Sequence, residues 1–167
     1  METVVRMGEA AASCTPADVL ACIGLGSCIG LVLVDAPGGV AALAHVMLPE
    51  ATQADPEQPP RFADLAVPFL LDQAEAHGAR RARVRAVLVG GAAMFTFGGG
   101  QDIGARNEAA VRAGLRAAGI TVAAAATGGS RGRTVRVHVG EQPSITVREA
   151  GGTDEQLFGA RREGVAA

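Results

Sequence analysis

Apolar residues in this 167-residue chain fall mostly into short runs separated by turns rich in glycine and proline. The clearest pair is Ile29–Val34 and Val40–Met47, which are apolar, contain β-branched residues and flank the segment Asp35-Ala-Pro-Gly-Gly39. This pattern predicts two strands joined by a tight turn, that is, a β-hairpin. In such a hairpin the start of the first strand and the end of the second become neighbours.

The rest of the chain predicts more strands than helices. Two segments repeat apolar residues at helical spacing, Phe62–His77 and Asn107–Ala118. Pro68 limits the first, so its regular helix is expected to begin near Val67, and Asn107 is expected to be the N-cap of the second. Runs typical of strands are Thr3–Met7, Val19–Ile23, Arg83–Val89, Ile120–Ala126, Thr134–Val139 and Ser144–Arg148. This mixture indicates an α+β domain of layered type.

Length and charge narrow the class of protein. A chain of this size fits one domain with an ordinary core, and 49% of its residues are hydrophobic. Its apolar runs are too short to span a bilayer, and we see no basic and apolar leader, so we expect a cytoplasmic protein without membrane insertion. The net charge of −2, with arginine as the sole basic residue type besides histidine, argues against nucleic-acid binding.

The thiol Cys28 and the imidazole His45 lie at the two ends expected to meet in the predicted hairpin. A free thiol has a pKa of about 8.5 and needs a base or a positive environment to react at neutral pH. A neighbouring imidazole provides that base. Gly26 and Ser27 precede the thiol and are candidates to bring backbone N–H groups to a substrate carbonyl. These residues predict acyl transfer by a Cys-His pair.

The remaining thiols and histidines suggest structural roles. Cys14 is expected to be a buried or half-buried apolar group, His77 a capping residue at a helix end, and His138 an exposed strand residue. A zinc site from Cys22, Cys28 and His45 is conceivable but lacks a second closely spaced ligand pair. The glycine repeats do not match a dinucleotide fingerprint, so we expect no cofactor and no metal.

Two polar or glycine-rich segments leave alternatives open. The segment 49–60 is rich in proline and acidic residues, and it is expected to be a surface loop beside the site, either a lid, a docking surface or a plain connector. Phe95 and Phe97 lie in a glycine-rich segment, where they either fold back onto the domain or face a partner.

Four ordered motifs resemble the CheD family of chemoreceptor glutamine deamidases. They are Leu25-Gly-Ser-Cys-Ile-Gly30 with Ala44-His-Val-Met-Leu-Pro49, Gly90-Gly-Ala-Ala-Met-Phe95, Ile103-Gly-Ala-Arg-Asn107 and Thr127-Gly-Gly-Ser-Arg131. The likeness extends from about Met7 to Gly152. It implies a single-domain layered α/β/β sandwich with mixed sheets and two main helices on one side, over 1–158. Because the chain turns polar after Gly152, we expect a flexible tail at 159–167.

The resemblance also implies an activity, protein-glutamine glutaminase, which converts glutamine side chains of methyl-accepting chemotaxis receptors to glutamate. Some family members also hydrolyse methyl esters, and the family pairs with the CheC phosphatase. The family's nucleophile and histidine correspond to Cys28 and His45. Its third catalytic residue is a threonine where this chain has Cys22. A thiol is a poorer hydrogen-bond partner, so orientation of the imidazole is weakened, supplied by a backbone carbonyl, or supplied otherwise.

Two other functions remain open at this point. The first is a binding module that has kept the fold and mainly regulates a CheC-type phosphatase, since a fold can outlive its chemistry. The second is a different cysteine hydrolase, such as a protease or a general amidase, which a Cys-His pair alone would allow.

Overall fold

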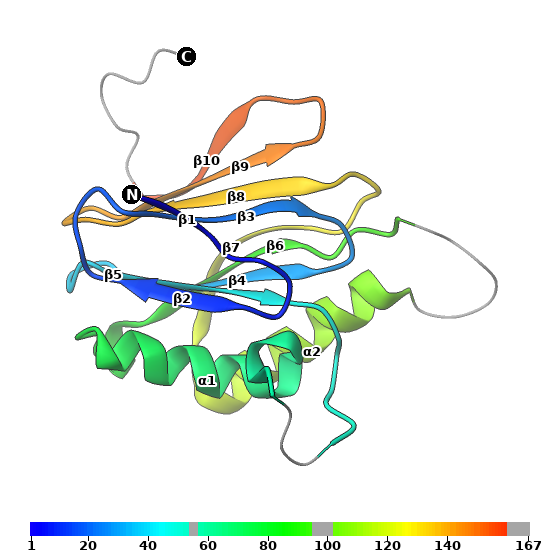
Figure 1. Cartoon of the computed structure of the whole chain (residues 1–167), viewed down its shortest axis with the longest axis horizontal. Helices are drawn as coiled ribbons and strands as arrows, with labels where there is room; N and C mark the ends of the chain where they lie inside the picture. Colours follow the sequence, from blue (N-terminus) through cyan, green and yellow to red (C-terminus); the bar gives the residue numbers. More distant parts are fainter. Residues whose placement is uncertain (54–56, 95–101, 160–167) are drawn as a thin grey trace.

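Two five-stranded sheets and two helices make up the fold (Figure 1). The computed structural model describes residues 1–53, 57–94 and 102–159, and element counts refer to these ranges. The first sheet has the order β1 (Glu2–Val4), β3 (Val19–Leu25), β8 (Arg133–His138), β9 (Ser144–Glu149), β10 (Asp154–Phe158). The second has the order β2 (Ala10–Ser13), β5 (Val40–Val46), β4 (Ile29–Asp35), β6 (Arg85–Gly90), β7 (Thr121–Thr127). The helices are α1 (Ala63–Ala76) and α2 (Ile103–Ala118), with short 3-10 turns at Pro59–Arg61 and Arg81–Arg83.

The elements stack in three layers. Both helices pack on the outer face of the second sheet, where they share one apolar core with β4, β5 and β6. A second apolar core fills the space between the two sheets. Each sheet is mixed, because β1 pairs with β3 and β6 with β7 in parallel while the other pairs are antiparallel. The predicted α+β fold, an α/β/β sandwich with two helices on one side, is therefore confirmed.

The hairpin of β4 and β5 lies at the centre of the second sheet, and every residue of both strands is buried. Its turn is held by Asp35, whose buried carboxylate accepts hydrogen bonds from the backbone N–H groups of Gly38 (3.0 Å) and Arg80 (2.9 Å) and pairs with Arg83 (2.9 Å). Burial alone would raise the pKa of Asp35, but these donors lower it. The turn is thus anchored at one end of the sandwich, and the open end of the hairpin carries Cys28.

Both helices begin earlier than predicted. α1 starts at Ala63, and Pro68 lies within it on an exposed position, where its missing N–H removes one hydrogen bond near the first turn. α2 starts at Ile103 because the side chain of Asp102 is the N-cap and accepts from Ala105 N–H at 2.9 Å. The prediction that Asn107 caps this helix was wrong, and the residue lies inside it.

Other local predictions had mixed outcomes. His77 is the C-cap of α1, and its Nδ1 donates to the carbonyl of Gln73 (2.8 Å), as expected. Cys14 was expected to be at least half-buried but is exposed, because β2 ends at the buried Ser13 and the chain turns there. β10 was not predicted, since Asp154–Phe158 is mostly polar; it forms an exposed edge strand beside β9.

Candidate active site

The register of the β4–β5 hairpin places Cys28 and His45 on the same side of the second sheet. His45 lies opposite Gly30 and Val46 opposite Ile29. Because side chains alternate along a strand, Cys28 shares a face with Gly30, two residues further on. Cys28 and His45 are therefore diagonal neighbours, for which Cα atoms are typically about 7–8 Å apart. The predicted hairpin is confirmed, and the two residues are offset by one step rather than directly opposite.

Gly30 lies between the two residues on this face, and core side chains pack closely over it. A Cβ added at Gly30 would lie 3.0 Å from Leu25 Cδ1 and 3.3 Å from Val135 Cγ1, both in the core between the sheets. The shared face therefore points into the layer between the sheets. His45 is 6% exposed and Cys28 is half-buried at the rim of this layer. The thiol can meet a substrate while the imidazole stays enclosed.

The imidazole of His45 is held by a backbone carbonyl. Its Nδ1 lies 3.1 Å from the carbonyl oxygen of Val5, which can only accept, so Nδ1 carries the proton and Nε2 keeps a free lone pair. Its backbone N–H donates to Glu9 O and its carbonyl accepts from Gly8 N–H, both at 3.0 Å. The segment between β1 and β2 thus holds the imidazole in place with Nδ1 protonated.

The charges of the site favour a neutral resting state. Burial lowers the pKa of His45, and the bond to Val5 and the charge of Glu9 only partly oppose this. Burial raises the pKa of the Cys28 thiol. Burial also raises the pKa of Cys22, with the nearby Cys28 as a second cause, and Cys22 is fully buried between the sheets. These directions favour a neutral thiol at Cys28 and a neutral imidazole at His45 near neutral pH.

The backbone carbonyls of three successive residues, 26–28, accept hydrogen bonds from other parts of the chain. The carbonyl of Gly26 accepts from Ala92 N–H (2.9 Å), and that of Cys28 accepts from Gly91 N–H (2.9 Å). The carbonyl of Ser27 accepts from the Asn107 side chain (3.0 Å). We call the segment 25–28 the nucleophile turn. Its conformation is set by residues from two motifs far away in the sequence.

A third motif binds the segment at 90–93, which in turn holds the nucleophile turn. Gly128 N–H donates to Gly90 O (3.0 Å), and Ala93 N–H donates to Gly129 O (2.8 Å). Arg133 then binds the carbonyl of Gly128 through Nη1 (2.7 Å). The segments that carry the four motifs therefore gather at one end of the sandwich. Sequence reasoning missed Asn107 as part of this site, although its place in a recurring motif was a usable signal.

Gly104 allows α2 to approach Gly91 and Ala92 closely, and these two residues bind the nucleophile turn. A Cβ at this residue would lie 2.5 Å from Ala92 O and 2.6 Å from Gly91 O, both backbone atoms that cannot move aside cheaply. We expect Gly104→Ala to lower the free energy of unfolding by about 1–3 kcal/mol and to reduce catalysis by shifting the turn. Urea denaturation followed by circular dichroism measures the first effect.

The matched control for Gly104→Ala is Gly114→Ala in the same helix. There the added Cβ would meet Val67 Cγ2 at 3.2 Å and other atoms at ordinary contact distance. Alanine also has the better helix propensity, by about 0.8–1.0 kcal/mol. Equal stability losses in the two variants would show that the close approach of Gly104 has no special importance.

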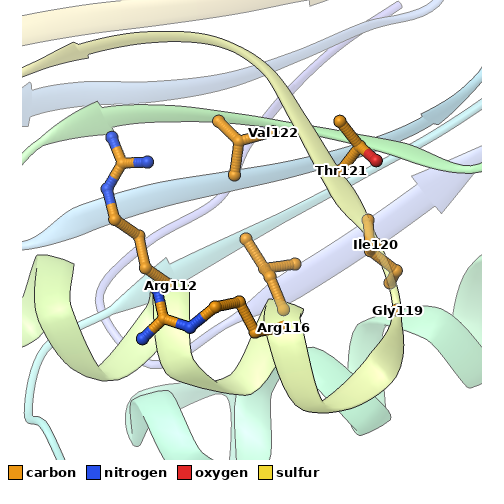
Figure 2. A pocket seen from close by; sticks show the side chains of 7 residues that line it. Arg112, Arg116, Gly119, Ile120, Thr121 and Val122 are labelled. Atoms are coloured by element: carbon orange, nitrogen blue, oxygen red, sulfur yellow. The ribbon is translucent and has the colours of Figure 1, made fainter.

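Two cavities lined by described residues lie away from Cys28. One of them, of about 470 Å³, lies beside the C-terminal end of α2. Figure 2 shows the side chain of Arg112 extending from the helix toward the sheet and that of Arg116 running along the helix. Another of about 610 Å³ lies near Pro37 in the β4–β5 turn. The nucleophile turn instead contacts the N-terminal half of α2. We assign no chemistry to these cavities.

Several predictions lie partly outside the described residues. Phe95 and Phe97 fall in 95–101, the segment 49–60 is interrupted at 54–56, and most of the predicted tail falls in 160–167. Within the described part, Gln58 lies against Gly8, next to the strand that carries His45. The described residues contain no group of three or more His, Cys, Asp or Glu side chains placed to hold a metal ion. None of their helices has the length and apolar character needed to cross a membrane.

The fold and site define a class of protein, a single layered α+β unit with a half-buried thiol and a buried imidazole on the same sheet face. Within that class the chain belongs to the CheD family, because the profile described as "CheD chemotactic sensory transduction" matches residues 47–148. Cys28 and His45 precede this match.

Curated relatives extend the comparison over nearly the whole chain. The chemoreceptor glutamine deamidase CheD of Thermotoga maritima is 38% identical over 155 residues, 93% of this chain and 96% of the relative. That of Halalkalibacterium halodurans is 41% identical over 141 residues, 81% of this chain and 87% of the relative. A probable chemoreceptor glutamine deamidase CheD of Clostridium novyi is 40% identical over 140 residues, which are 81% of this chain and 86% of the relative. An alignment covering 93% of this chain necessarily includes the region of Cys28 and His45.

Proposed function

We propose that this protein is a chemoreceptor glutamine deamidase, a cysteine hydrolase that converts receptor glutamine side chains to glutamate. The single observation that carries the proposal is the imidazole of His45, held by Val5 O in the Nδ1–H tautomer on the same sheet face as Cys28. The names of the relatives supply the substrate class. Because those relatives are named for chemoreceptors, we expect the protein to act in the cytoplasm on the receptors' cytoplasmic domains.

The first half-reaction forms a thioester. Nε2 of His45 takes the proton of the Cys28 thiol while the sulfur bonds to the carboxamide carbon, and the electron pair of the C=O bond moves to oxygen. The backbone N–H groups of Ser27 and Cys28 are the proposed donors to this oxyanion, with Gly26 allowing the close approach. When the C=O bond reforms, the C–N bond breaks and the imidazolium protonates the departing nitrogen, which leaves as ammonia.

The second half-reaction returns the enzyme to its starting state. His45 removes a proton from water, whose oxygen attacks the thioester carbon. The tetrahedral intermediate then expels the sulfur, which recovers its proton from the imidazolium. The net change is one amide and one water converted to one carboxylate and one ammonium ion. No metal or organic cofactor is needed for any step.

The proposal is tested with purified receptor cytoplasmic fragments and the wild-type protein. We expect ammonia release together with conversion of particular glutamines to glutamate, read by peptide mass spectrometry. The same fragments incubated with heat-denatured protein are the control. Conversion at no glutamine, under conditions where the folded protein binds the fragment, would contradict the proposal. The same spectra show whether methyl esters are also hydrolysed.

Cys22 stands where the family has a threonine, and its role is testable by restoring that residue. Cys22 is fully buried and its thiol is held protonated by burial, while the imidazole already has a partner in Val5 O. We expect Cys22→Thr to keep or raise the deamidation rate. Burying the new hydroxyl should lower the free energy of unfolding by about 1–3 kcal/mol unless it finds a partner. A large loss of rate in a folded variant would show that Cys22 has a role of its own.

A second candidate function is regulation of a CheC-type phosphatase by a protein with little turnover. The observation that favours it is the neutral thiol, because burial raises the pKa of Cys28 and so lowers its intrinsic reactivity. Phosphatase stimulation measured with wild type and Cys28→Ala separates the two functions. If the protein acts only by binding the phosphatase, Cys28→Ala should stimulate the phosphatase as well as wild type does. Deamidation, in contrast, requires the Cys28 thiol and should be lost.

A further inference from the structure

Asn107 is a buried polar residue on a helix face that is otherwise apolar. The buried positions of α2 are Gly104, Asn107, Val111 and Leu115, and Asn107 is 0% exposed. Figure 1 places the N-terminal end of α2 at the same end of the sandwich as the connection between β3 and β4. A polar group enclosed in this way is unfavourable unless its donors and acceptors are satisfied.

The side chain of Asn107 links the two halves of the site. Its Nδ2 donates to the carbonyl of Ser27 (3.0 Å), just before Cys28, and to that of Met47 (2.9 Å), two residues after His45. Because both partners are carbonyls, the nitrogen must face them. The remaining atom, Oδ1, has no hydrogen-bond partner among the described residues. The Asn107 side chain therefore uses its N–H donors, while its carbonyl oxygen makes no hydrogen bond among the described residues.

The bond to Ser27 fixes the direction of the next N–H group. Within a planar trans peptide, the C=O of one residue and the N–H of the next point in opposite directions, and the described residues contain no cis peptide. Asn107 draws the Ser27 carbonyl toward the helix layer. The N–H of Cys28 therefore points away from α2, toward the layer between the sheets, where the Cys28 side chain also packs.

We propose that Asn107 is a positioning residue for the deamidation reaction. It aims the Cys28 N–H at the oxygen that becomes negative when the Cys28 sulfur bonds to the carboxamide carbon and the thiol proton moves to His45. It also ties the nucleophile turn to the strand that carries the base, through Met47. The inference rests on the proposed function, since it assumes attack by Cys28. Asn107 itself touches no reacting atom.

Kinetics of Asn107→Ala and Asn107→Asp test this role. Removal of one oxyanion donor typically lowers kcat by about 10²–10³-fold, so we expect a fall of about 100-fold with KM changed by less than about threefold. Val111→Ala is the matched control, because it disturbs the same helix face one turn away without touching the nucleophile turn. Equal loss of kcat in Val111→Ala at comparable Tm would overturn the proposal, and so would unchanged kcat in folded Asn107 variants.

Alkylation of Cys28 by iodoacetamide separates positioning of the N–H from general disorder of the site. Displacement at the saturated carbon of iodoacetamide creates no oxyanion, so we expect the alkylation rate in the Asn107 variants to stay within about threefold of wild type. Peptide mass mapping assigns the label to Cys28 rather than to the exposed Cys14. An alkylation rate that falls in proportion to kcat would show that Asn107 only holds the thiol in place, and it would overturn the inference.

A measurement on the wild-type protein covers the case in which the variants do not fold. With ¹⁵N-cysteine labelling, the Cys28 amide resonance should shift when a peptide aldehyde analogue of glutamine forms its adduct on the thiol. An adduct seen by mass spectrometry without a shift of that resonance would overturn the inference. Failure of the proposed function looks different, because the wild type itself would then release no ammonia. An active wild type with equally active Asn107 variants would refute only the inference.

Discussion

Cys28→Ala is expected to abolish receptor deamidation, with a fall in kcat of about 10⁴-fold or more, as found when a hydrolase loses its nucleophile. The thiol lies half-buried at the rim of the layer between the sheets, on the same face as the His45 imidazole. Alanine removes the sulfur and leaves the backbone bonds of the nucleophile turn unchanged, because these are made by carbonyls. Fold and Tm should therefore change little. Ammonia release and mass spectrometry of the receptor fragment measure the loss.

Cys14→Ala is the matched control for this experiment. It removes the same chemical group from an exposed position just after β2. We expect wild-type kcat and KM in this variant. If Cys28→Ala released ammonia at the wild-type rate, Cys28 would not be the nucleophile, and the chemistry proposed for this site would have to be abandoned.

Most of the fold was predictable because its strands are short, apolar and separated by glycine or proline. The hairpin of β4 and β5 is the clearest case, since its two faces are both buried and its turn residues stand out. β10 was not predictable from composition, because an edge strand exposed to solvent can be polar and still pair through its backbone. The early start of α2 was hidden by the glycines that precede Asp102.

The candidate site was predictable in its residue types but not in its geometry. A hairpin centred near Pro37 allows Cys28 to lie opposite several neighbouring residues, and only the register shows that His45 faces Gly30. The carbonyl of Val5 could not be found from sequence, because any residue can supply a backbone acceptor at that place. Asn107 was read as a cap because its partners, Ser27 and Met47, are distant in the chain.

The structure explains why the four motifs occur together. Two of them bind carbonyls of residues 26–28 directly, and the motif at 127–131 binds the segment at 90–93 that makes part of those bonds. Gly90 and Gly104 lie so close to neighbouring carbonyls that no side chain fits at either position. A Cβ at Gly90, for example, would clash with Cys28 O. The motifs are therefore the support of one turn rather than four separate sites.

His45→Asn is expected to lower kcat by about 10³-fold, in the range found when a general base is lost. The Asn side chain offers an N–H close to the place of Nδ1 and can keep the bond to Val5 O, but it has no counterpart of the basic Nε2. His45→Ala removes both and serves as the comparison. If the two variants have similar kcat but His45→Asn has the higher Tm, the loss of catalysis comes from the missing Nε2, and the bond to Val5 O contributes to stability.

The pH dependence of wild type follows from the same two groups. His45 acts as a base only when neutral, and burial lowers its pKa, so the acid limb of kcat/KM should have its midpoint below the ordinary histidine value of about 6.5. Burial raises the pKa of Cys28, so alkylation by iodoacetamide should keep increasing with pH beyond the ordinary thiol value of about 8.5. A preformed ion pair would behave oppositely, with alkylation that persists well below neutral pH. That profile would replace general-base attack with attack by a resting thiolate.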